Sequence, residues 1–94
     1  MMMHKFLELN DGTEMVYSDI LHDDEGRETV KVYIEKPVHL GFKSAYCYLP
    51  EYRWEKVEGF TSDEMEILRD IVKSTSHLVI QFARQGGIGN AANF

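Results

Sequence analysis

The sequence has few of the features that mark specialised classes of protein. It contains one cysteine, Cys47, so no internal disulfide can form, which argues against a small disulfide-stapled secreted domain. No apolar run approaches the roughly 20 residues that a membrane-spanning helix requires. The opening methionines and His4-Lys5 lack the long apolar core of a signal peptide. These absences predict a cytoplasmic protein with no membrane contact.

The charge is acidic overall and unevenly spread. The 94 residues carry a net charge of −6, and residues 1–26 hold seven acids against one lysine. Residues 27–56 hold six basic side chains against four acids and form the only basic stretch. Nucleic-acid binding depends on a clustered basic face that neutralises phosphates. The overall charge therefore argues against nucleic acid as a partner and confines any such face to the middle third.

Short segments of β-type sequence fill the first two thirds of the chain. Val30, Val32 and Ile34 alternate with polar residues, which is the period-two pattern of a half-buried strand. Asn10-Asp11-Gly12 predicts a hairpin turn, and Pro37 is expected to end a strand because proline cannot donate to the ladder. Strands are predicted over residues 4–9, 13–21, 27–36, 42–49 and 51–58. Five strands with short connections indicate an antiparallel meander.

A helix is predicted to begin at Thr61. Thr61 and Glu64 form the pattern of a capping box, and Phe60 with Met65 forms a hydrophobic staple. The apolar spacing continues to about residue 85 in one phase, which predicts either one helix or a two-helix hairpin. Ser74-Thr75-Ser76 are weak helix formers and favour a break. The fold class is thus α+β, a meander of about five strands with a helix or helix pair (about 62–85) on one face.

The expected domain covers residues 1–87, and residues 88–94 are expected to be a loose tail. Gly86-Gly87 predicts the helix end, because glycine readily adopts the left-handed conformation of a helix C-terminus. A phosphate-binding role for these glycines is disfavoured, since such loops need a helix after them and here the helix precedes them.

No pattern of catalytic or metal-binding residues stands out. His22-Asp23-Asp24-Glu25 lacks the spacing of a calcium loop and reads as a solvated turn. The histidines at positions 4, 22, 39 and 77 include no pair at the helical spacing of a zinc enzyme. Cys47 falls inside a strand between two tyrosines, where a small buried apolar residue is expected rather than a nucleophile. The sequence predicts no cofactor.

The strand over residues 42–49 breaks the simple alternation. One parity carries Phe42, Ser44, Tyr46 and Tyr48, and the other carries Ala45, Cys47 and Leu49. Helices can cover only one face of the sheet, so the other face is expected to expose aromatic side chains. Contiguous apolar patches of this kind mark contact surfaces. The predicted binding residues are Tyr33, Tyr46, Tyr48 and Trp54.

Three functions are compatible with the sequence. The preferred hypothesis is a non-enzymatic binding, interaction or regulatory module that forms a homodimer or binds a protein partner. The first alternative is a small enzyme or small-molecule binder with a site at the strand ends, using Cys47, His39 or a carboxylate. The second alternative is a binder of single-stranded nucleic acid that stacks bases on Tyr46, Tyr48 or Trp54. Its basic side chains would be Lys43, Arg53 and Lys56.

Overall fold

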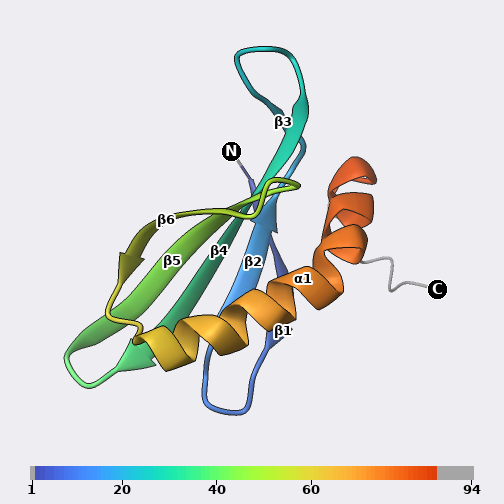
Figure 1. Cartoon of the computed structure of the whole chain (residues 1–94). Helices are drawn as coiled ribbons and strands as arrows, with labels where there is room; N and C mark the ends of the chain where they lie inside the picture. The colour runs from blue at the N-terminus through green and yellow to red at the C-terminus, as the bar shows by residue number, and fades with distance from the viewer. Residues whose placement is uncertain (1, 87–94) are drawn as a thin grey trace.

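The computed structural model describes residues 2–86, and it confirms the α+β class, with an antiparallel sheet followed by one helix packed against it. The strands are β1 (Met3–Glu8), β2 (Glu14–Ser18), β3 (Leu21–His22), β4 (Glu28–Val38), β5 (Gly41–Leu49) and β6 (Arg53–Glu58), and the helix is α1 (Ser62–Arg84). The main sheet has the order β1-β2-β4-β5-β6, and β3 pairs with the start of β4. The predicted tail, residues 88–94, lies outside the described residues. Figure 1 shows α1 lying across one face of the sheet.

The core lies between α1 and the face of the sheet that the alternation predicts. Val30, Val32 and Ile34 of β4 point toward the helix and are buried, as are Ala45 and Cys47 of β5. The remaining buried apolar side chains are Met15, Tyr17, Leu49, Met65, Leu68, Val72, Val79 and Ala83. The helix contributes residues spaced three, four or seven apart, which is the spacing of one helical face. Within residues 2–86, every buried side-chain nitrogen and oxygen has a hydrogen-bond partner.

The second predicted strand is in fact two strands, because the chain turns away from the sheet after Ser18. The Ser18 hydroxyl accepts a hydrogen bond from the backbone N–H of Lys31 at 2.9 Å and donates to the carbonyl of Asp19 at 2.7 Å. The Ser18 side chain thus accepts the Lys31 N–H that a backbone carbonyl of the neighbouring strand would otherwise accept. The chain re-enters as β3, and the β3–β4 hairpin projects beyond the end of the main sheet (Figure 1).

The prediction that Pro37 ends a strand is wrong, since β4 continues to Val38 and Pro37 pairs with Phe42 of β5. The N–H of Lys31 points toward β2, so the nitrogens of alternate residues, including Pro37, point to that side. The pairing of β2 with β4 ends at Glu35. The missing N–H of Pro37 therefore falls where no strand would accept it, and the ladder with β5 stays intact.

The helix break expected at Ser74-Thr75-Ser76 is also absent, because α1 is continuous from Ser62 to Arg84. The hydroxyl of Thr75 donates to the carbonyl of Ile71 at 2.8 Å, and Ser74 donates to the same carbonyl at 3.0 Å. Hydroxyls bonded back in this way are satisfied inside a helix and tend to bend it. The helix in Figure 1 turns upward in its second part, so the chain follows the twisted sheet by bending instead of breaking.

The start of α1 is fixed by the predicted capping box. The backbone N–H of Glu64 donates to the Thr61 hydroxyl at 3.2 Å, and the Glu64 carboxylate accepts from the Thr61 N–H at 2.8 Å. Lys43 of β5 also donates to both Glu64 oxygens, at 2.9 and 2.8 Å. The Lys43 bond is the main cause that lowers the pKa of Glu64 to about 2, followed by the bond from the Thr61 N–H. One carboxylate thus caps the helix and ties its first turn to the sheet.

Replacing the cap should lower the stability of the fold. Thr61→Ala leaves a helix N–H without its partner, and we expect a loss of about 1 kcal/mol in the free energy of unfolding. Urea denaturation followed by circular dichroism measures this loss. Ser62→Ala, at an exposed neighbouring position, is the control and should change stability by less than about 0.5 kcal/mol. An unchanged midpoint for Thr61→Ala would show that the box does not stabilise the helix start.

Candidate functional site

The face of the sheet away from α1 carries a cluster of three tyrosines. Tyr33 of β4 pairs directly with Tyr46 of β5, and their ring centroids are 4.8 Å apart. Tyr48 lies two residues along β5 on the same side, opposite Lys31. All three rings are half-buried although no element in the described part of the chain covers them. We call this surface the open face.

Two cations hold the rings of the open face. The Lys31 ammonium lies 4.1 Å from the ring centroid of Tyr46 and 5.8 Å from that of Tyr48. The guanidinium carbon of Arg53, on β6, lies 4.5 Å from the Tyr48 centroid. Cations within about 6 Å of an aromatic centroid are attracted to the face of the ring. Tyr46 and Tyr48 are therefore packed against cations of the same chain.

The phenol of Tyr33 is fixed as a neutral hydrogen-bond donor. Its hydroxyl donates to the Glu35 carboxylate at 2.8 Å. Burial and then this carboxylate raise the pKa of Tyr33 to about 12. The bond also holds the Glu35 side chain against the open face, so this acid has a defined position beside the tyrosines.

Strand register arranges the open face in three rows that cross the strands. The basic row contains Lys31, Tyr48 and Arg53. The tyrosine row contains Lys5, Val16, Tyr33, Tyr46 and Glu55. The acidic row contains Glu8, Glu14, Glu35, Ser44 and Glu58. The tyrosine row lies between the other two. The open face therefore changes from basic to acidic along the direction of the strands.

The structure corrects the predicted grouping of Trp54 with the three tyrosines. Trp54 pairs with Cys47, whose side chain is buried under the helix, and Trp54 itself packs against the core. It therefore lies on the opposite face of the sheet. Parity places Arg53 and Glu55 on the open face instead. The sequence could not reveal this, because the loop between β5 and β6 leaves their register undetermined.

The basic side chains proposed for nucleic-acid binding are dispersed. Arg53 does lie beside Tyr48, but Lys43 is paired with Glu64 at the helix start. Lys56 lies in a bulge of β6, where the backbone φ angle is +53°. Lys31 is the basic residue that the sequence analysis missed. It shares the parity of Tyr33 in β4, so strand alternation could have identified it.

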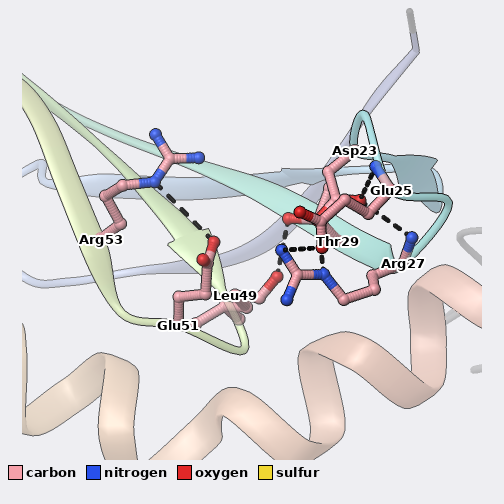
Figure 2. A network of polar contacts seen from close by, with 7 residues as sticks. All are labelled: Asp23, Glu25, Arg27, Thr29, Leu49, Glu51 and Arg53. Atoms are coloured by element: carbon pink, nitrogen blue, oxygen red, sulfur yellow. Dashed lines mark hydrogen bonds and ion pairs between the residues drawn. The ribbon is translucent and has the colours of Figure 1, made fainter.

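A polar cluster lies at the end of the sheet near the β3–β4 turn (Figure 2). The Asp23 carboxylate accepts from the Arg27 guanidinium and from the backbone N–H groups of Glu25 and Arg27, each at 2.9 Å. Across a shallow hollow of about 250 Å³, Arg53 contacts Glu51 at 3.8 Å. Arg27 also contacts Glu25 at 3.4 Å, so the turn is held by ion pairs of its own residues, which fits the predicted solvated turn. Within residues 2–86, no three His, Cys, Asp or Glu side chains lie close enough together to hold a metal ion.

The residues of the enzyme hypothesis are not brought together. Cys47 is fully buried near the end of β5, and burial raises the pKa of its thiol to about 11. His39 lies exposed in the β4–β5 turn. Six residues of extended strand separate Cys47 from the start of β5, which is about 20 Å at the usual rise. No thiolate–imidazole pair forms between these two residues.

The β4–β5 hairpin ends in an apolar tip that the sequence analysis did not single out. Leu40 is 92% exposed, and Phe42, on the strand beside it, is 62% exposed. The φ angle of Leu40 is +64°, a left-handed conformation that costs a residue with a β-carbon about 1 kcal/mol. The sequence signal for this apolar tip is Val-His-Leu-Gly-Phe at residues 38–42, because a tight turn normally carries polar residues.

Comparison of the chain with protein-family models, with curated proteins and with solved structures finds no match. Among residues 2–86, α1 is too polar to cross a membrane. No relative or structural neighbour therefore supplies a role for the open face.

The thiol of Cys47 should react slowly in the folded protein. Only the thiolate attacks, and both the burial and the raised pKa keep this group protonated and out of reach at pH 7.5. We expect labelling by a disulfide reagent to be at least about 100-fold slower in buffer than in 6 M urea, measured by absorbance. Equal rates in the two conditions would show that Cys47 is accessible and would revive the nucleophile hypothesis.

Proposed function

We propose that the protein is a non-enzymatic interaction module that self-associates through the open face. The observation that carries this proposal is the cluster of Tyr33, Tyr46 and Tyr48, held by two cations on a surface that no described element covers. Tyrosine and arginine are among the side chains that most often anchor protein interfaces. The rings already contact one another, the cations and Glu35 in the single chain, which reduces the side-chain entropy lost on association. The module is proposed to act in the cytoplasm, as the single cysteine favours.

A protein surface fits the open face better than a nucleic acid does. Bases stacked on Tyr46 or Tyr48 would bring their phosphates close to the acidic row. The acidic row, with Glu14, Glu35 and Glu58, would repel the phosphates that follow. The net charge of −6 adds a repulsion of phosphates that is strongest at low salt and is screened as the salt concentration rises. These charges favour a partner that itself carries both signs.

A second copy of the chain meets this requirement. The open face has basic side chains on one side of the tyrosine row and acidic side chains on the other. A surface that contains both signs in separate places can be complementary to itself, as a two-fold symmetric dimer requires. In the polar cluster of Figure 2, Arg27 is already paired with Asp23 and Glu25 of the same chain. We therefore place the contact on the open face.

Sedimentation equilibrium between 1 and 200 µM tests this proposal. We expect a reversible dimer, and we expect Tyr46→Ala to weaken it by at least about tenfold, the loss typical of an anchor residue. Ile67→Ala is the matched control, since Ile67 is an exposed apolar side chain on α1, away from the open face. Thermal unfolding should confirm that both variants are folded.

Two results would contradict the proposal. One is a wild-type protein that sediments as a monomer at all of these concentrations. The other is a dimer that Ile67→Ala disrupts and Tyr46→Ala does not. A single-stranded oligonucleotide that binds the wild type in 150 mM salt, but not Tyr46→Ala, would replace self-association with base stacking as the function of this face.

A further inference from the structure

The charge rows of the open face also define how two copies would meet, on the basis of the proposed self-association. We infer that two copies pack face to face with their strands reversed, so that the basic row of each copy lies on the acidic row of the other. The two-fold axis then runs along the tyrosine row, across the strands. Each tyrosine of that row faces its own equivalent in the second copy.

Strand geometry supports this placement. The basic and acidic rows each lie two residues from the tyrosine row, on opposite sides, which is about 7 Å at the usual rise per residue. Rotation about the tyrosine row therefore exchanges the two outer rows and leaves each strand facing the same strand of its partner. Lys31 comes to face Glu35 of the other copy, and Arg53 comes to face Glu58. Because the interface is symmetric, each of these pairs forms twice.

The other aligned arrangement is opposed by charge. If the two-fold axis ran along the strands, every row would face itself. Glu14, Glu35 and Glu58 would then face the acidic row of the second copy. Lys31 and Arg53 would face the basic row of the second copy. Like charges placed opposite one another across an interface cost several kcal/mol. Aligned sheets pack with their strands within about 30°, so whole rows do face whole rows.

Several other charges of the open face are partly neutralised within one copy. Lys5 contacts Glu8 at 3.0 Å and Glu14 at 3.4 Å, which offsets one of these two carboxylate charges at the β1–β2 end. Glu55 is paired with Arg53. Arg53 is therefore already neutralised within its own copy, so the ion pair left to form between copies is Lys31 with Glu35. Glu35 is held for this role by the Tyr33 hydroxyl.

The size of the face sets the expected strength. Three rows across five strands cover about 400 Å² of each copy, at the usual strand spacing and rise. The total for two copies is about 800 Å², below the roughly 1,200 Å² of specific stable interfaces, so the contact is expected to be weak and reversible. We expect a dissociation constant in the micromolar range that rises with ionic strength, because the ion pairs lie near the rim.

Exchange of the facing charges between two variants tests this arrangement. Lys31→Glu and Glu35→Lys should each weaken self-association by at least about tenfold, because each variant places like charges opposite one another. An equal mixture of the two variants should restore a dimer with wild-type affinity, since the acid of one then faces the lysine of the other. Asp70→Lys and Lys73→Glu, on the exposed side of α1, are the matched control pair and should have no effect.

The possible results separate the two claims. A wild-type dimer that Tyr46→Ala disrupts, but that the mixed variants do not restore, would overturn the reversed arrangement and leave the proposed self-association standing. A dimer that neither Lys31→Glu nor Glu35→Lys weakens would also overturn the reversed arrangement and leave the self-association standing. A wild-type monomer would overturn both. Restoration in the mixture also excludes misfolding as the cause of weak association in the single variants.

Discussion

The period-two alternation of β4 and β5 is the constraint on which the rest of the structure depends. These two central strands pair over nine residues, and their even and odd side chains point to opposite faces. One face carries the buried side chains against which α1 packs, among them Val30, Val32, Cys47 and Leu49. A shift of one residue in this register would place the tyrosines under the helix and the core in solvent. The fold and the candidate site therefore have a common origin.

The same alternation places tyrosine rings on the face that α1 does not cover, and the cations of this face shield them from water. With a single helix in the described residues, only one face of the sheet is sealed. The tyrosines on the other face reduce their contact with water by packing against each other and against Lys31 and Arg53. The long side chains of these cations cover apolar ring surface while their charged ends reach solvent. A face built in this way is stable alone and is still suited to a partner.

The sequence predicts the elements whose signals are local. Thr61 and Glu64 identify the helix start because a capping box involves four neighbouring residues. The inward parity of Val30, Val32 and Ile34 is equally local, and the structure confirms it. Three of the four predicted binding residues, Tyr33, Tyr46 and Tyr48, lie together for the same reason. Whether they bind a partner is a proposal.

The wrong predictions concern strand register, turn shape and side-chain hydrogen bonding within the helix. Pro37 is accepted inside β4 because β2 has already ended beside it, which only the register reveals. Trp54 packs against the core because the β5–β6 turn determines which residues of β6 face the helix, and the sequence does not reveal the shape of that turn. The serine and threonine residues of α1 bend the helix instead of breaking it, because their hydroxyls find carbonyls of the preceding turn. Each outcome depends on a neighbour that is distant in the sequence or on a rotamer choice.

The most direct test of the central claim is an isotope-filtered nuclear Overhauser experiment on a mixture of labelled and unlabelled protein at about 500 µM. This measurement detects only contacts between different copies. Our account predicts intermolecular signals from the rings of Tyr33 and Tyr46 to the same rings of the second copy, and from Lys31 to Glu35. Intermolecular signals confined to α1 or to the Leu40 tip, or none at all, would contradict the claim that the open face is the contact surface.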